Sequence, residues 1–195
     1  HDWLVDHNVY NSGAANGNPT DRSPWEAISA LDGGLSPVCE GYARQFPGYP
    51  LKNLLLSGGT GLGKTFLSGC IAREVSQRGY SVVYDTAIRL FAAFETRRFT
   101  RDAGEERQAR DDTRRCLGCD LLILDDLGSE LTTPLSQASL YEVVNSRIQA
   151  GRHTIISTNL SMDHIAQRYT PQLASRIGGL YQELTFYGDD LRLRR

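Results

Sequence analysis

One octapeptide restricts the fold of this chain more than any other feature of its sequence. Residues 58–65 read Gly-Gly-Thr-Gly-Leu-Gly-Lys-Thr and match the pattern G-x-x-x-x-G-K-[ST], with a short apolar run before them and a helical pattern after them. Glycines allow the backbone to turn successive N–H groups inward, and such a nest binds phosphate oxygens. The motif therefore predicts a strand, a phosphate-binding loop and a helix in direct succession.

Each residue of this loop has an expected place beside a bound nucleotide. Lys64 brings a compact positive charge to the phosphates, and the Thr65 hydroxyl ligates Mg²⁺. Of the 21 basic residues only Lys52 and Lys64 are lysines, so a lysine stands where a narrow phosphate nest requires a point charge rather than a planar guanidinium. The backbone cradle is formed by Gly58, Gly59, Thr60, Gly61, Leu62 and Gly63.

Two acids follow the most apolar run of the chain. Residues 121–124 read Leu-Leu-Ile-Leu, and Asp125 and Asp126 come next. The carboxyl ends of parallel strands meet at one edge of a sheet, so these acids are expected beside the glycine-rich loop. We expect Asp125 to hold Mg²⁺, largely through water, and Asp126 to orient or deprotonate the attacking water. Asn159 follows the next apolar run and is the candidate to place that water. The alternative is that these residues only shape turns.

Short apolar runs alternate with helical patterns from residue 51 onward. Strands are expected at 53–57, 81–84, 120–125, 154–157 and about 180–186. This alternation predicts a parallel sheet covered by helices on both faces. We assign residues 1–22 to an N-terminal extension or linker and residues 23–195 to one α/β domain, with Ser23 capping its first helix. A later helix begins at Thr133-Pro134, and its expected inward side chains are Leu140, Tyr141, Val144 and Ile148.

Composition excludes some functions for this chain. The net charge of −2 does not favour bulk binding to nucleic acid or membranes, and no apolar run approaches the roughly 18 residues of a membrane span. We therefore expect a cytoplasmic protein without a membrane partner. Cys116 and Cys119 form a C-L-G-C pair without a second pair at zinc spacing, which favours reduced thiols over a redox pair. The chain begins at His1 and its only methionine is Met162, so we expect a fragment of a longer protein.

Residues 97–115 concentrate charge, with seven arginines and five acids. The first interpretation is a solvated helix whose opposite charges pair at a spacing of four residues. The alternative is a groove for single-stranded DNA, in which Arg97, Arg98 and Arg101 follow the phosphates and Phe99 stacks on a base.

The segments GGTGLGKT, LLILDDLGSELT, IISTNL, SRIGG and GDDLR together resemble the ATPase domain of the DnaC/DnaI-type helicase loaders, in the AAA+ superfamily. The resemblance runs from about Leu51 to the C-terminus. It implies a three-layer P-loop NTPase with a five-stranded sheet of order 5-1-4-3-2, no lid domain, and ATP with Mg²⁺ as cofactors. It also implies a homo-oligomer on single-stranded DNA and a replicative ring helicase as partner, gripped through a separate N-terminal domain.

By the same resemblance, three residues have roles in hydrolysis. Asn159 corresponds to sensor 1, Arg176 to the arginine finger that reaches the γ-phosphate of a neighbouring subunit, and Arg192 to the terminal sensor arginine. An arginine supplied in trans is worth about 10³–10⁵ in rate, so isolated subunits are expected to hydrolyse ATP slowly. Asp126 stands where glutamate is commoner, and its shorter side chain puts fast hydrolysis in doubt rather than binding.

Several functions share these features. The first hypothesis is the ATP-hydrolysing motor of a helicase loader. An IstB-type helper ATPase of transposition has the same core, and Asp126 keeps open a nucleotide-gated scaffold with little hydrolysis. A small-molecule kinase is the fourth and least favoured hypothesis. A kinase needs a pocket for the phosphate acceptor, whereas this chain has an arginine-finger pattern.

Overall fold

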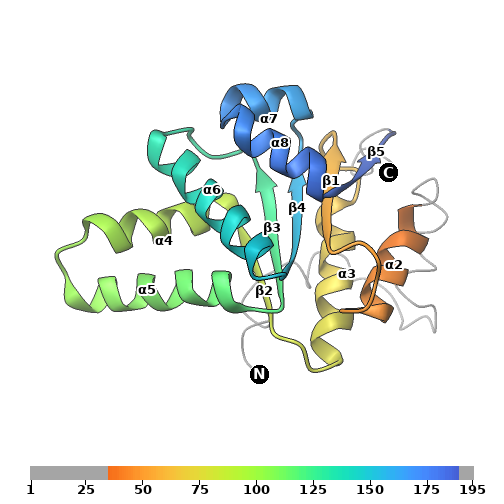
Figure 1. Ribbon diagram of the computed structural model, residues 1–195, viewed down its shortest axis with the longest axis horizontal. Coiled ribbons are helices and arrows are strands. Elements are labelled where there is room, and N and C mark those ends of the chain that lie inside the picture. Colours follow the sequence, from red (N-terminus) through yellow and green to blue (C-terminus); the bar gives the residue numbers. More distant parts are fainter. Residues whose placement is uncertain (1–34, 189–195) are drawn as a thin grey trace.

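A five-stranded parallel sheet forms the centre of the computed structural model, which describes residues 35–188 (Figure 1). The strand order is β2-β3-β4-β1-β5, and every neighbouring pair is parallel. Read from the other edge, this is the order 5-1-4-3-2, so the predicted sheet is confirmed. The strands are β1 (Asn53–Gly58), β2 (Val82–Thr86), β3 (Leu121–Leu127), β4 (His153–Thr158) and β5 (Gln182–Phe186).

Helices cover both faces of the sheet because successive residues of its buried strands point to opposite sides. Leu54 and Leu56 of β1 lie in one apolar core with α2 and α3, whereas Leu55 lies in a second core with α4, α6, α7 and α8. The helices are α2 (Leu35–Gln45), α3 (Lys64–Gln77), α4 (Ala87–Phe99), α5 (Ala103–Gly118), α6 (Pro134–Gln149), α7 (Met162–Arg168) and α8 (Pro171–Leu180).

The helices α4 and α5 form an antiparallel hairpin that projects beyond the edge strand β2 (Figure 1). Each begins at a side-chain cap. Thr86 accepts a hydrogen bond from the Arg89 N–H at 3.3 Å, and Asp102 accepts one from the Glu105 N–H at 2.8 Å. Such caps satisfy N–H groups that the helix itself leaves without partners.

Helix α6 corrects one expectation about the core. It begins after Thr133 with a reciprocal capping box to Ser136, as the Thr-Pro signal predicts. Tyr141, however, is 36% exposed, and Val143 is buried instead. The buried stripe of this helix runs through Ser139, Leu140, Val143, Val144 and Arg147. Tyr141 lies one residue off that stripe, or about 100° around the axis, and so it faces outward. The helix expected from Ser23 lies mostly outside the described residues.

Arg147 is fully buried, which the sequence analysis did not anticipate. Its guanidinium donates to the Cys116 carbonyl at 2.6 Å, to the His153 carbonyl at 2.6 Å and to the Thr154 hydroxyl at 3.0 Å. It thereby binds the end of α5 to the start of β4. Burial lowers the pKa of Arg147, while the nearby Cys119 acts in the opposite direction.

The cysteines of the C-L-G-C segment are packing residues within this arrangement. Cys116 and Cys119 are both buried and free. Burial raises the pKa of the Cys116 thiol to about 12 and raises that of Cys119 as well. Residues 35–188 contain no cluster of three or more His, Cys, Asp or Glu side chains able to hold a metal ion. No helix in the same range is long and apolar enough to cross a membrane.

We predict that Arg147→Met lowers the free energy of unfolding by about 3 kcal/mol, because two buried carbonyls and a hydroxyl lose their donor. Arg152→Met is the matched control. Arg152 is partly exposed and pairs with Asp120 at 3.5 Å, so its loss is expected to cost less than about 1 kcal/mol. Urea unfolding of both variants gives the comparison, and equal midpoints would contradict the structural role of Arg147.

Candidate nucleotide-binding site

The glycine-rich loop joins β1 to α3 at the carboxyl edge of the sheet. Gly58, Gly61 and Gly63 have φ angles of 138°, 71° and 92°, a region that other residues rarely adopt. Gly63 is the N-cap of α3, and no side chain caps this helix. The first turn of a helix leaves backbone N–H groups without intrahelical partners, so α3 presents donors suited to an anion at this loop.

Lys64 lies over the same loop rather than in solvent. Its side chain is only 8% exposed, and its Nζ donates to the Gly58 carbonyl at 2.7 Å and to the Gly59 carbonyl at 2.5 Å. A buried ammonium group is stable only with such partners. The loop therefore holds the one positive charge of the motif where phosphates bound by the nest would contact it.

Asp125 lies beside this loop, as its position after an apolar strand predicts. The carboxylate is 5% exposed, and the Thr65 hydroxyl lies 3.4 Å from Oδ1. The Ser157 hydroxyl, at the end of β4, also donates to Oδ1. A carboxylate next to the P-loop hydroxyl is the donor set that Mg²⁺ requires beside a nucleotide, so the residues present fit this ion.

Tyr84 is part of this site, although the sequence analysis did not single it out. Its hydroxyl donates to Oδ2 of Asp125 at 2.7 Å and lies 3.4 Å from the Thr65 carbonyl oxygen. Burial raises the pKa of Tyr84 above its usual range, and the neighbouring Asp125 raises it further, so the hydroxyl stays a donor. The available signal was its place near the end of a strand expected to adjoin that of Asp125.

Asp126 has an unusual backbone conformation. Its φ angle of 55° is the only positive one at a non-glycine residue among residues 35–188, and the register of β3 against β4 shifts between Leu124 and Leu127. The Asp126 N–H donates to the Ser157 hydroxyl at 3.0 Å, and the side chain is exposed. A bulge re-aims a side chain at the end of a strand, and this one separates the buried Asp125 from the exposed Asp126.

Glu130 fixes the loop that follows Asp126. It is 7% exposed; its carboxylate accepts from the Gly128 N–H at 2.9 Å and from the Tyr169 hydroxyl. Arg168 donates to the Glu130 carbonyl and lies 3.9 Å from its carboxylate. Arg168 therefore joins α7 to this loop. These contacts give Arg168 and Glu130 a structural role that needs no nucleotide.

The remaining candidates occupy different parts of the molecule. Asn159 is exposed at the end of β4, the strand that lies between β1 and β3. Arg176 lies on α8, where it donates to the Tyr141 hydroxyl at 3.2 Å and its guanidinium carbon lies 5.4 Å from the centre of the Tyr141 ring. These contacts join it to α6 rather than to the glycine-rich loop. Arg192 lies outside the described residues.

The fold and the site together define a class of protein. A parallel sheet of this order, with the glycine-rich loop after β1 and the acid pair on β3, is the core of an AAA+ P-loop NTPase. A family model described as "IstB-like ATP binding protein" matches residues 50–177. The chain belongs to this family.

The curated relatives include helicase loaders, insertion sequence ATP-binding proteins and the chromosomal replication initiator DnaA. The replicative helicase loader DnaC of Escherichia coli is 25% identical over 136 residues, or 70% of this chain and 54% of the loader. A putative insertion sequence ATP-binding protein of Sinorhizobium fredii is 35% identical over 109 residues, or 55% of this chain and 41% of that protein. This chain therefore spans about half the length of these curated relatives.

Solved structures share the fold. A crystal structure of the DnaC helicase loader matches with a TM-score of 0.66 at 20% identity, covering 78% of this chain and 88% of that one. The replication initiator DnaA, bound to AMPPCP and single-stranded DNA, matches with a TM-score of 0.71 at 20% identity, covering 88% and 51%. At this identity the likeness establishes the fold alone.

We predict that Gly58→Ala destabilises the domain by about 2–4 kcal/mol, because the new Cβ would lie 2.4 Å from the Phe186 carbonyl oxygen at a φ of 138°. Gly79→Ala is the control. Its φ is 88°, and no atom lies within 4 Å of the added Cβ. Only the left-handed backbone conformation is then unfavourable for alanine, and we expect it to lower the free energy of unfolding by about 1 kcal/mol. Urea unfolding without nucleotide checks both. Similar losses in the two variants would show that the contact of β5 with the loop is unimportant.

Proposed function

We propose that this chain is the ATP-binding and hydrolysing motor of a DNA replication helicase loader, assembling on single-stranded DNA and acting on a ring helicase. The observation that carries its ATPase activity is the convergence of Lys64, Thr65 and Asp125 at the end of β1 and β3. Similarity to the DnaC loader over 70% of the chain supports the choice of pathway.

The proposed division of labour follows the geometry of the site. The loop from Gly58 to Gly63 and Lys64 bind the ATP phosphates, while Thr65 and Asp125 hold Mg²⁺, which neutralises phosphate charge when bound. The exposed carboxylate of Asp126 orients or deprotonates the attacking water, and Asn159 helps to place it.

Arg176 is proposed to complete the site of a neighbouring subunit. It lies at the surface, and Tyr141 contacts it through both a hydrogen bond and the face of its ring. A cation held by one hydrogen bond and an aromatic face is pre-oriented but still open to an anionic ligand. Residue 192 is proposed to contact nucleotide, as the resemblance implies.

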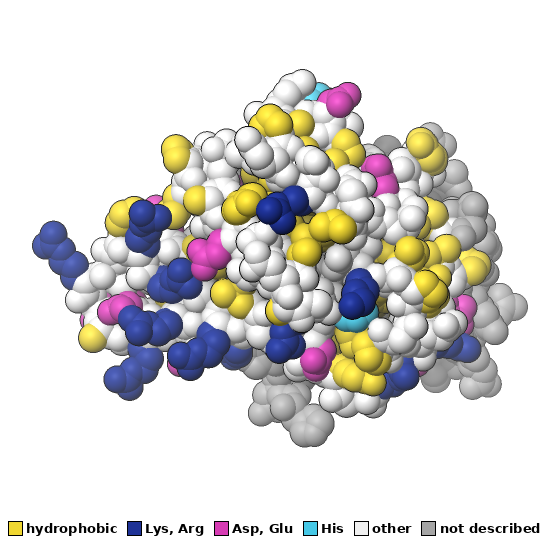
Figure 2. All heavy atoms as spheres, viewed as in Figure 1, with side chains coloured by type: hydrophobic (Ala, Val, Ile, Leu, Met, Phe, Trp, Pro, Cys, Tyr) yellow, Lys and Arg dark blue, Asp and Glu magenta, His cyan; other side chains and the backbone are white. Residues whose placement is uncertain are grey.

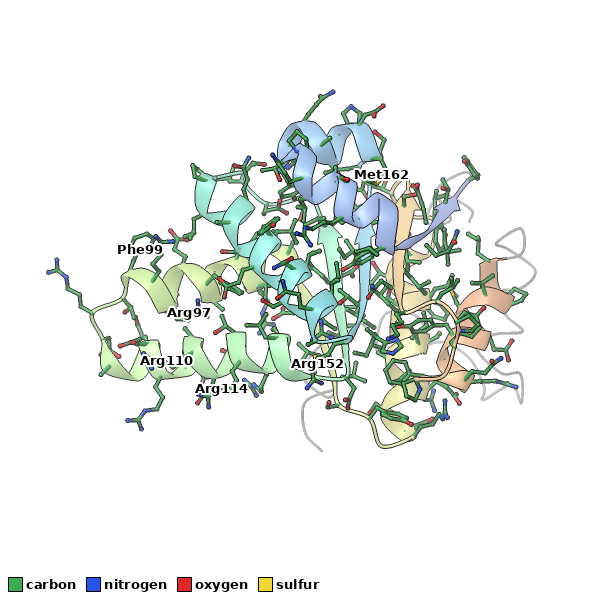
Figure 3. All side chains as sticks on the ribbon, viewed as in Figure 1. Arg97, Phe99, Arg110, Arg114, Arg152 and Met162 are labelled. Atoms are coloured by element: carbon green, nitrogen blue, oxygen red, sulfur yellow. The ribbon has the colours of Figure 1, made fainter. Side chains whose placement is uncertain are left out.

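The α4–α5 hairpin is the proposed contact for single-stranded DNA. Figure 2 shows basic side chains gathered over this hairpin, and Figure 3 shows Phe99 near its far end. Arg98 and Arg101 are exposed, and so is 64% of Phe99. Arg97 and Arg98 also line a cleft of about 310 Å³ between α4 and α6. Exposed cations beside an aromatic face suit phosphates and bases together.

Two ion pairs lie along α5, which agrees with the solvated-helix interpretation for that helix. Arg110 pairs with Glu106, and Arg115 pairs with Asp112. Arg97 is also partly engaged, because it lies 3.4 Å from Glu142. The DNA proposal therefore depends more on Arg98 and Arg101 than on the whole arginine-rich segment.

A helper ATPase of transposition is the second candidate. The IstB-like family model and the 35% identity to an insertion sequence ATP-binding protein favour it. The two candidates share the ATP site and differ in partner, so turnover stimulated by a ring helicase, but not by a transposase, would decide for the loader.

We expect ATP turnover to rise with protein concentration and with single-stranded DNA, since a trans arginine requires assembly. Lys64→Ala should abolish turnover by removing the charge at the phosphates. Phosphate release measured over a range of protein concentrations gives the result. Tight ATP binding with turnover at the level of the Lys64→Ala control throughout would instead indicate a nucleotide-gated scaffold.

Replacing Arg97, Arg98 and Arg101 by alanine together should weaken binding to single-stranded DNA by about 10-fold. The plot of the logarithm of the association constant against the logarithm of salt concentration should become less steep, its slope falling in magnitude by roughly 2. A control variant with Arg44, Lys52 and Arg73 replaced by alanine removes the same charge elsewhere on the surface. Fluorescence anisotropy at several salt concentrations measures both. An equal loss in both variants would indicate a general charge effect and reject the hairpin as the binding surface.

A further inference from the structure

The two carboxylate oxygens of Asp125 have different hydrogen-bond partners. Oδ1 faces the Thr65 and Ser157 hydroxyls, whereas Oδ2 accepts a 2.7 Å hydrogen bond from Tyr84. This is the short distance typical of a hydroxyl that donates to a carboxylate. Two hydroxyls thus fix the orientation of the carboxylate from opposite neighbouring strands, since Tyr84 lies on β2 and Ser157 on β4.

The position of Tyr84 in the sheet explains its reach. β2 lies beside β3, with Val82–Thr86 in register with Leu121–Asp125 (Figure 1). The Tyr84 ring packs against the core on the α3 face. Its hydroxyl is therefore near both Asp125 and the Thr65 carbonyl, 3.4 Å away in the first turn of α3. A single side chain contacts both elements that hold the proposed magnesium ligands.

We propose that Tyr84 is a positioning residue of the Mg²⁺–nucleotide site, holding the Asp125 carboxylate in the orientation that the ion requires. This inference rests on the proposed function of Asp125. Tyr84 acts through Asp125 rather than on the nucleotide. Side chains that orient metal ligands commonly change metal affinity by about 10–100-fold when removed, because the ligand must otherwise be ordered at the moment of binding.

A purely structural role would have a different signature. Loss of a buried hydrogen bond lowers stability in every nucleotide state, with or without Mg²⁺. A positioning role changes the dependence of nucleotide binding on Mg²⁺ and leaves binding without the ion unchanged. The two roles are therefore separated by measuring affinity rather than turnover.

The test is the binding of a fluorescent ATP analogue to the full chain across Mg²⁺ concentrations and in EDTA. Tyr84→Phe keeps the ring and removes the hydroxyl, and we expect the Mg²⁺ concentration at half-maximal enhancement to rise about 10-fold with unchanged affinity in EDTA. Tyr80→Phe is the control, because Tyr80 packs against the same core and its ring lies edge-on to Phe46. It should leave the Mg²⁺ dependence unchanged.

An unchanged Mg²⁺ midpoint in Tyr84→Phe, or an equal loss of affinity in Mg²⁺ and EDTA, would overturn the proposal. Asp125→Asn and Lys64→Ala separate this failure from that of the proposed function. If Lys64→Ala binds the analogue like the wild type, the nucleotide site itself is wrong. If Asp125→Asn shifts the midpoint and Tyr84→Phe does not, only the role of Tyr84 fails. The double variant Tyr84→Phe, Asp125→Asn should shift no further than Asp125→Asn.

Discussion

The buried carboxylate of Asp125 is the constraint on which the rest of the site depends. A carboxylate taken from water needs hydrogen-bond donors, and here they come from three other elements: Thr65 on α3, Tyr84 on β2 and Ser157 on β4. Each donor reaches the carboxylate only because its strand ends, or its helix begins, at the same edge of the sheet. Satisfying one acid therefore aligns three strands and the helix after the glycine-rich loop. The same alignment brings Lys64 over that loop, so the geometry that makes burial tolerable is also the geometry that suits a magnesium nucleotide.

How far the sequence predicts this arrangement depends on the range of each interaction. The glycine-rich loop, the acid pair and the caps at Thr86 and Thr133 are local patterns, and the sheet follows from their alternation with apolar runs. Tyr84 was missed because its partner Asp125 is 41 residues away along the chain. Arg147 was missed because its burial depends on α5 as well as on nearby β4, and its partner Cys116 on α5 is 31 residues away. Tyr141 was misplaced for a related reason. Which face of a helix is buried depends on what packs against it. The sequence pattern treats an arginine as exposed, but α6 buries Arg147, so its buried face differs from the predicted one by one residue.

The loop after Asp126 has a second consequence for the proposed site. Glu130 ties this loop to the end of α7 through Tyr169 and Arg168, and α7 packs against α8. Helix α8 carries Arg176, which is proposed to act on a neighbouring subunit. The loop after Asp126, the acid proposed to act on the nucleotide, is thus joined by buried contacts to the helix that carries the proposed trans arginine. A shift of either would change the packing of the other, because buried contacts do not deform freely.

Strand β2 gives the proposed DNA surface a similarly short connection to the nucleotide. Tyr84 contacts Asp125, and two residues later Thr86 caps α4, the helix that ends in Arg97, Arg98 and Phe99. Among residues 35–188, β2 is an edge strand with β3 as its one neighbour in the sheet, so fewer contacts hold it in place than hold the central strands. A ligand that moved the hairpin would act on β2 first and, through Tyr84, on the orientation of the acid. Coupling between DNA and ATP would then require no rearrangement of the central sheet, only a change in whether one hydroxyl lies within reach of one carboxylate.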